Sequence, residues 1–346
     1  YVGGEFTTAD GNTVNHIAKW NGNTWSPLTD GTNGVVYALA VFDHGNGPVL
    51  YVGGSFSTAG GINAARIARW DGLDWRRVRA GIDGEVRALQ VFDDGSGDAL
   101  FVGGLFTRAG NQEVSNLAKW SGSGWSAVSE GANNWIHVMT VFEDGGGSAL
   151  YVGGDFWEIG GQQINRIARW DGANWTPLGS GIAYPGEVSA CNALGVFDDG
   201  TGTALYVGGA FSLAGGVPAN HIAKWTGTDW FPLGDGIMSD SGFLPPVTAM
   251  TAYDDGAGSS LYLGGDFYAA GPHQSFNIAR WGCPVSACEP CDMNCDGSVN
   301  ALDIEPFLDL LFGPNPQPCG TCTGDVNGDG RIDALDIEPF LECLFG

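Results

Sequence analysis

Short apolar runs alternate with glycine-rich, acidic turns along the first four-fifths of the chain. Each run is four to nine residues long and rich in Val, Ile, Phe and Trp, as half-buried strands are. The candidates in one stretch are Arg66–Trp70, Trp75–Val78, Glu85–Phe92 and a run that begins at Ala99. Turns such as Asp93-Asp94-Gly95 provide residues that accept a positive φ in hairpins. The pattern predicts an all-β fold for this part.

The pattern repeats with a period of about 50 residues. A motif of the form Tyr-Val-Gly-Gly-x-Phe begins at Tyr1, Tyr51, Phe101, Tyr151, Tyr206 and Tyr262. A segment Ile/Leu-Ala-Lys/Arg-Trp follows each copy and ends at Trp20, Trp70, Trp120, Trp170, Trp225 or Trp281. In the first five copies a second tryptophan lies five residues later. Four short strands per period, repeated six times, predict a six-bladed β-propeller over residues 1–282.

The repeat resembles kelch repeats, in which a strand ending in Gly-Gly is followed by an aromatic residue and a tryptophan. The matching residues in one unit are Tyr51-Val52-Gly53-Gly54, Trp70 and Trp75. The chain starts at the second strand of a unit, and the sixth unit lacks its tryptophan-bearing last strand. We expect an upstream segment, a stub at Cys283–Ala287 or a strand from another subunit to complete the ring.

Residues 283–346 form a second predicted domain with a different composition. They hold seven of the eight cysteines and 12 acidic residues against a single base, Arg331. Two segments have oxygen-bearing side chains at loop positions 1, 3, 5, 9 and 12, glycine at position 6, and a backbone carbonyl available at position 7. The predicted ligands of two Ca²⁺ ions are Asp292, Asn294, Asp296, Ser298, Asn300 and Asp303, and Asp325, Asn327, Asp329, Arg331, Asp333 and Asp336.

The paired loops, each with Asp at its last position, resemble those of type I dockerin modules. Both loops lead into the same sequence, Ala-Leu-Asp-Ile-Glu-Pro-Phe-Leu, at residues 301–308 and 334–341. We expect a short helix after each loop, with an apolar stripe formed by Phe307, Leu308 and Leu311 and by Phe340, Leu341 and Leu344. The resemblance implies a protein partner, cohesin-like or another copy of the chain, contacting Ala301, Leu302, Ala334 and Leu335.

The cysteines of the tail allow a zinc site, disulfides or free thiols. Cys288-x-x-Cys291 and Cys319-x-x-Cys322 have the spacing of a four-thiolate zinc site, whereas disulfides would stabilise a small module in an oxidising compartment. We favour disulfides, because an acidic, glycine-rich repeat protein is typical of secreted proteins. Cys191 lies apart, within a predicted strand, where we expect it to be buried.

A basic residue precedes the first tryptophan of every unit: Lys19, Arg69, Lys119, Arg169, Lys224 and Arg280. We expect these side chains to lie on the adjacent tryptophan and to pair with a carboxylate of the next blade; a ring that binds a ligand is the alternative. A second slot holds His16, Arg66, Asn116, Arg166, His221 and Asn277, which predicts a solvated or inter-blade polar position.

The formal net charge is −25, so there is little basic surface to bind nucleic acid, and no run is long enough to span a membrane. No motif of a metalloprotease, serine hydrolase, P-loop or dinucleotide site is present. We expect a secreted, non-enzymatic, calcium-binding interaction or structural protein, able to assemble into a filament or surface layer. The alternative is a protein that binds or degrades carbohydrate, with Glu187 and Asp240 as candidate acids in the irregular loops Ala183–Glu187 and Ile237–Pro246.

Overall fold

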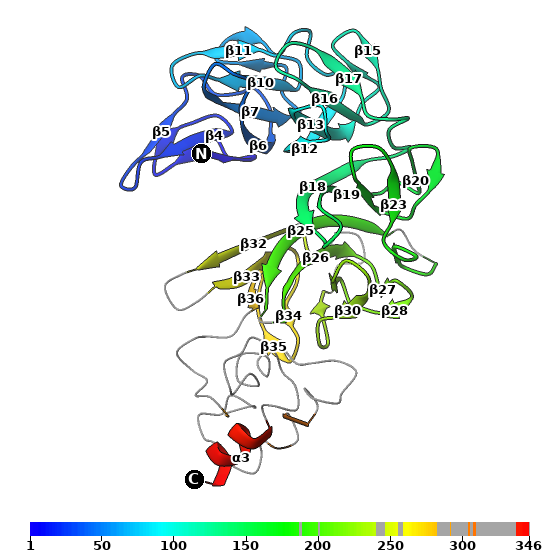
Figure 1. Ribbon diagram of the computed structural model, residues 1–346. Helices are drawn as coiled ribbons and strands as arrows, with labels where there is room; N and C mark the ends of the chain where they lie inside the picture. The colour runs from blue at the N-terminus through cyan, green and yellow to red at the C-terminus, as the bar shows by residue number, and fades with distance from the viewer. Residues whose placement is uncertain are drawn as a thin grey trace. The chain divides into compact units, whose positions relative to one another are not determined.

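The computed structural model describes residues 1–186, 189–199, 201–239, 246–254, 259–281, 291, 304, 307–308 and 337–345. The chain divides into two compact units, Tyr1–Gly181 and Ile182–Gly346. We call them unit 1 and unit 2 and describe each separately (Figure 1).

Unit 1 contains four main antiparallel sheets among its described residues, one for each sequence repeat. In order of pairing they are sheet I, β1 (Val2–Gly3), β4 (Ile17–Trp20) and β5 (Trp25–Pro27); sheet II, β6 (Val36–Asp43), β7 (Pro48–Gly54), β10 (Ile67–Trp70) and β11 (Trp75–Arg77); sheet III, β12 (Glu85–Asp93), β13 (Asp98–Leu105), β16 (Leu117–Trp120) and β17 (Trp125–Ala127); and sheet IV, β18 (Ile136–Glu143), β19 (Ser148–Gly154), β22 (Ile167–Trp170) and β23 (Trp175–Pro177). All four strands predicted around residues 66–105 are confirmed.

Unit 2 repeats the same plan. Its main sheets are sheet V, β25 (Ala190–Asp198), β26 (Thr203–Ala210), β29 (Ile222–Trp225) and β30 (Trp230–Pro232), and sheet VI, β32 (Ala249–Asp254), β33 (Ser259–Gly264) and β36 (Ile278–Trp281). Sheet VI has three strands among the described residues, and the residues that directly follow Trp281, where the sequence predicts no tryptophan-bearing last strand, lie outside them.

Very short strands, which the sequence analysis did not predict, form hairpins beside the sheets. They are β2 (Thr8–Ala9), β3 (Asn12–Thr13), β8 (Thr58–Ala59), β9 (Ile62–Asn63), β14 (Arg108–Ala109), β15 (Gln112–Glu113), β20 (Glu158–Ile159), β21 (Gln162–Gln163), β24 (Ile182–Ala183), β27 (Leu213–Ala214), β28 (Val217–Pro218), β31 (Ile237–Met238), β34 (Ala269–Ala270) and β35 (His273–Gln274). The segment that leaves one sheet pairs with the hairpin of the next, as in the bridge between Ile82 and Ala109. Backbone hydrogen bonds therefore join neighbouring sheets within unit 1.

The Gly-Gly pair of each repeat lets successive sheets pack closely. A Cβ on Gly53 would lie 2.4 Å from Cγ1 of Val86 in sheet III, and one on Gly54 would lie 2.1 Å from the carbonyl oxygen of Val35. Both distances are far below van der Waals contact, so any side chain would push the backbone or the neighbouring sheet away. The core between sheets is built from fully buried residues of the same motif, such as Tyr51 and Val52.

In the first five repeats the two tryptophans face each other across adjacent strands. Trp70 pairs directly with Trp75 in the β10–β11 ladder, and their ring centroids lie 5.4 Å apart. The other four pairs have centroid distances of 4.9–5.2 Å. Such cross-strand aromatic pairs stabilise the outer edge of a sheet beyond the area they bury.

The described part of the tail contains one complete helix, α3 (Ile337–Phe345). Pro339 lies in its first turn, where a missing N–H costs no helical hydrogen bond. Ile337, Phe340 and Leu344 recur at helical spacing and turn toward a small core. No helix in the described part of the chain is long and apolar enough to cross a bilayer.

Candidate functional site

The predicted calcium ligands and partner contacts lie outside the described residues. They are Asp292, Asn294, Asp296, Ser298, Asn300, Asp303, Asp325, Asn327, Asp329, Arg331, Asp333 and Asp336 for calcium, and Ala301, Leu302, Ala334 and Leu335 for a partner. The candidate acids Glu187 and Asp240 also lie outside them. Within the described residues no group of three His, Cys, Asp or Glu side chains is placed to hold a metal ion.

The residues next to the two predicted loops form a common core. Phe307 and Phe340, which occupy the same position in the duplicated segments, stack with ring centroids 3.9 Å apart and an interplanar angle of 18°. Ile304 and Ile337, another equivalent pair, pack against them. The duplicated segments thus meet through matching residues, as two paired loop-helix units would.

The apolar stripe predicted for these segments is only partly correct. Phe307 and Phe340 are buried, but Leu308 and Leu341 are 47% and 44% exposed. The aromatic residue and the leucine that follows it are neighbours in sequence, so a helix directs them about 100° apart. The module therefore presents two equivalent leucines to solvent.

A disulfide joins Cys291 to Cys343 and closes a loop with a sequence separation of 52 residues. Cys291 is fully buried against Phe307 and Phe340. A cysteine in a disulfide has no thiolate to offer a metal, so Cys291 is not available for the four-thiolate zinc site. Cys191 is also fully buried, within β25, as the sequence predicted.

In sheets III, IV and V the basic slot of the repeat forms an ion pair within its own sheet. Lys224 donates to both oxygens of Asp199 at 2.7 Å, Arg169 donates to both oxygens of Asp144, and Lys119 donates to Oδ2 of Asp94. Each aspartate lies in the hairpin between the two inner strands of the sheet that carries its cation. The expectation of a carboxylate on the next blade is therefore wrong, because pairing of the second and third strands already brings the cation beside that hairpin.

In sheets IV and V a tyrosine completes this arrangement. The hydroxyl of Tyr151 donates to Asp144 at 2.6 Å and that of Tyr206 to Asp199 at 2.7 Å. Burial alone would raise the pKa of Asp199, but hydrogen bonds from Lys224 and Thr201 outweigh it and lower that pKa. Burial and the adjacent carboxylate raise the pKa of Tyr206. Asp199 is thus held as a carboxylate beside the cationic Lys224, and Tyr206 is held as a neutral phenol.

A row of polar and aromatic side chains lies at the start of the inner strands of unit 1. One residue bulges out of each of β6, β12 and β18, namely Tyr37, Arg87 and His137. The Arg87 guanidinium lies 4.1 Å from the Tyr37 ring centroid and 5.3 Å from that of Trp135. Trp135 stacks on His137, whose Nε2 lies 3.1 Å from Oδ1 of Asp155. Trp135 therefore packs within this row, whereas Trp157 is 50% exposed.

The sequence profile of the Rax2 C-terminal β-propeller domain matches residues 21–198, just over half of the chain. The chain belongs to this family. The match confirms a propeller-type all-β fold for the repeats, while the kelch and dockerin resemblances stay predictions. No curated protein matches the sequence.

A solved structure similar to this Rax2-family chain is described as the extracellular domain of a hybrid two-component system from B. thetaiotaomicron. The two sequences are 12% identical, with a TM-score of 0.42. The alignment covers 81% of this chain and 37% of that chain, so this chain spans just over a third of the length of that structure.

The variable polar slot of the Rax2-family repeats has a backbone role. Its six residues all have φ between 63° and 68°, a left-handed conformation in which side chains other than glycine are uncommon. Asn116 shows how such a residue is held, because its amide accepts from the Phe106 N–H and donates to the Ala132 carbonyl, each at 2.8 Å. Asn116 therefore joins two segments of its own repeat, and it is buried, not solvated as one of the two predicted alternatives had it. Burial lowers the pKa of His221 at this slot.

The buried aspartates of the Rax2-family sheets predict a loss of stability in acid. The pKa values of Asp94, Asp144 and Asp199 are all lowered in the folded protein: burial opposes ionisation, but hydrogen bonds from their partners exceed it. As the pH falls, the unfolded chain therefore takes up protons before the folded chain does. The stabilisation is complete above about pH 5 and is lost progressively as the pH falls through the lower pKa values of the folded state. Urea unfolding measured between about pH 6 and about pH 2.5 should show this fall in the free energy of unfolding.

A matched pair of variants isolates this effect. Asp144→Asn should reduce the acid sensitivity, because one of the linked carboxylates is gone, whereas Asp10→Asn at an exposed turn should leave it unchanged. An equal acid response in both variants would contradict the assignment.

Proposed function

We propose that this chain is a secreted, non-enzymatic interaction protein. Each repeat of about 50 residues is one kelch-like blade, so that the chain carries six blades, and the dockerin-like tail connects the propeller to a partner in a calcium-dependent way. The partner is a cohesin-like protein or a second copy of the chain. A second copy would lead to a filament or a surface layer.

The observation that carries this proposal is the meeting of the duplicated segments in the tail. Phe307 and Phe340 stack at equivalent positions, and each lies four residues after the last predicted ligand of its loop, Asp303 or Asp336. We infer from this contact that the two predicted loops would pair side by side. Paired loops of this kind are the arrangement in which EF-hand-type sites bind calcium.

Composition supports a need for the ions. Residues 283–346 carry 12 acidic residues and one base. Their carboxylates repel one another unless bound cations neutralise them. A module of about 60 residues rarely has a core large enough to be stable by itself, and bound calcium and the disulfide would supply the additional stabilisation. The exposed Leu308 and Leu341 offer the partner two equivalent apolar contacts.

Calcium removal tests the proposal. We expect titration calorimetry to find two Ca²⁺ ions per chain, and hydrogen exchange of residues 337–345 to speed up strongly in chelator while exchange in the sheets is unchanged. Asp292→Ala combined with Asp325→Ala should reproduce the effect of chelator, whereas Asp309→Asn, outside both loops, should not. A chain that binds no calcium and keeps the same exchange in α3 would refute the proposal.

A further inference from the structure

One stretch of unit 1 departs from the repeat by its charge. The outer strand of sheet II and the loop after it carry Arg76, Arg77 and Arg79, in a chain with only 14 basic residues. The positions equivalent to Arg77 hold Pro27, Ala127, Pro177 and Pro232, and those equivalent to Arg79 hold Thr29, Ser129, Gly179 and Gly234. Because the other repeats fold without arginine at these positions, the fold does not require it there.

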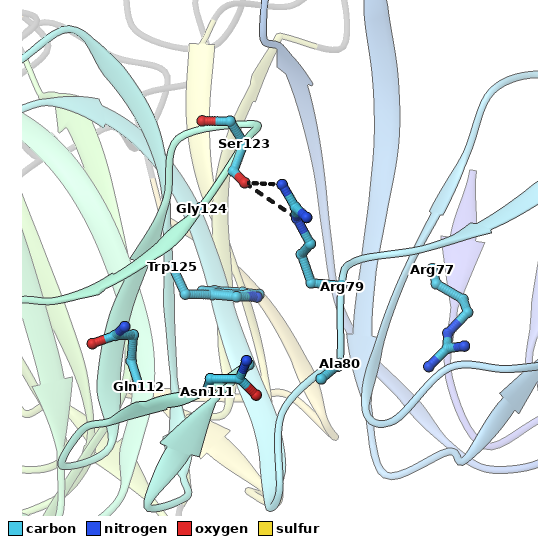
Figure 2. Close-up of a pocket in the computed structure, with 9 residues that line it drawn as sticks. Arg77, Arg79, Ala80, Asn111, Gln112, Ser123, Gly124 and Trp125 are labelled. Carbon is cyan, nitrogen blue, oxygen red and sulfur yellow. Dashed lines mark hydrogen bonds between the residues drawn. The ribbon is translucent and has the colours of Figure 1, made fainter.

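Arg77 and Arg79 line an open pocket of about 650 Å³ in unit 1. Its opposite wall is formed by sheet III, with Gly110, Asn111 and Gln112 from the β14–β15 hairpin and Ser123, Gly124 and Trp125 from the turn into β17. Figure 2 shows the Trp125 indole projecting from its strand toward the loop that carries Arg79 and Ala80. The pocket thus combines two guanidinium groups, two side-chain amides and an indole.

The two arginines have donors to spare. Arg79 uses its Nε and Nη2 groups to hold the Ser123 carbonyl at 3.2 and 2.7 Å, which fixes the guanidinium at the pocket wall. A guanidinium has five N–H donors, so three remain. Among the described residues no carboxylate lies within 4.0 Å of Arg77 or Arg79. Arg76, next to them in sequence, pairs instead with Asp71 and Asp74.

Unneutralised arginines beside a pocket are unexpected in a protein of net charge −25. Acidic residues are abundant enough to pair with them, and Arg76 shows that such pairing occurs one residue away. A guanidinium that is held in place but not neutralised is suited to bind a planar anion through two parallel hydrogen bonds. The pocket therefore has the chemistry of an anion site.

The rest of the lining identifies the kind of anion. The Asn111 and Gln112 amides each offer donors and an acceptor, which match hydroxyl groups that both donate and accept. The Trp125 indole offers an apolar edge or face for the C–H groups of a ring. We propose that this pocket binds an acidic saccharide, with Arg77 and Arg79 on its carboxylate or sulfate, the two amides on its hydroxyls and Trp125 against its ring.

The repeats themselves provide the test variant. Arg77→Ala combined with Arg79→Ser converts the pocket wall to the residues of the next repeat, Ala127 and Ser129, which the fold already accepts at these positions. Arg76→Ala is the matched control, because it removes one charge from the same strand but no residue of the pocket. Unfolding curves of both variants establish that each is folded.

Binding is measured by titration calorimetry on the full chain with short oligogalacturonates, oligosaccharides of a sulfated galactan, and neutral cello-oligosaccharides. We expect at least one acidic series to bind and the neutral series not to bind. The double variant should bind about tenfold or more weakly, since it loses the charged hydrogen-bond donors of the pocket. The stronger of the two acidic series identifies the anion as carboxylate or sulfate. The Arg76→Ala control should bind as the unaltered chain does.

Several results would overturn the proposal. They are absence of binding by both acidic series, equal binding of the neutral series, unchanged binding by the double variant, or an equal loss in the Arg76→Ala control. Equal binding of poly-glutamate would show that the pocket recognises acidic peptides instead of saccharides. None of these results depends on the calcium loops, so the outcome is distinct from that of the calcium experiment.

Discussion

Asp199→Ala is expected to lower the free energy of unfolding by about 3–5 kcal/mol, as breaking one side of a buried ion pair does. The side chains of Asp199 and Lys224 are only 13% and 10% exposed. The substitution leaves the Lys224 ammonium buried without its carboxylate and removes the acceptor of the Tyr206 hydroxyl. Urea unfolding of the full chain, followed by hydrogen exchange in β26 and β29, measures the loss.

Two further variants show whether the cause is the unpaired charge. Asp235→Ala removes an exposed carboxylate on the same unit and should change stability by less than about 0.5 kcal/mol. Asp199→Leu combined with Lys224→Met removes both charges and should cost less than Asp199→Ala alone. A loss below about 1 kcal/mol for Asp199→Ala would mean that the pair behaves as an ordinary surface ion pair.

Removing the Cys291–Cys343 disulfide is expected to destabilise the tail by about 4 kcal/mol. The estimate follows from the entropy that a cross-link with a sequence separation of 52 residues removes from the unfolded chain. Cys291→Ala combined with Cys343→Ser suits the two environments, because the first cysteine is buried among apolar side chains and the second is exposed. Faster hydrogen exchange in α3 and weaker calcium binding would both follow.

Reduction of the unaltered chain provides the control for this variant. Chain treated with a reductant should show the same exchange in α3 as the double variant, and the sheets of unit 1 should be unaffected by either treatment. If α3 stays protected when the disulfide is absent, the core around Phe307 and Phe340 is sufficient by itself.

The repeated strands were predictable because each repeat carries its own signal. Apolar runs, glycine turns and paired tryptophans recur at a fixed spacing, and the register of Trp70 with Trp75 follows from the tight turn between them. The short hairpins were missed, since strands of two residues, such as Thr58–Ala59, are too short to show any alternation.

Contacts that depend on position in space were harder to predict. The sequence shows a basic residue at the Lys224 position of every unit and an aspartate at the Asp199 position of several units. It does not show which sheet brings the two side chains together, and we expected the wrong one. Likewise, the pairing of Cys291 with Cys343 is one choice among several for the cysteines of the tail. The arginine pocket did have a signal in the sequence, the cluster Arg76, Arg77 and Arg79. The cluster stands out only when the repeats are aligned and compared at equivalent positions.

The bulge in each inner strand gives the fold a position that is free to change. Tyr37, Arg87, His137 and Asn192 occupy it in four successive repeats, and none of them takes part in the ladder of its own strand pair. Strand pairing therefore places no demand on the side chain at this point. A protein built by copying one unit can diversify there, one repeat at a time, without altering the backbone that all copies share.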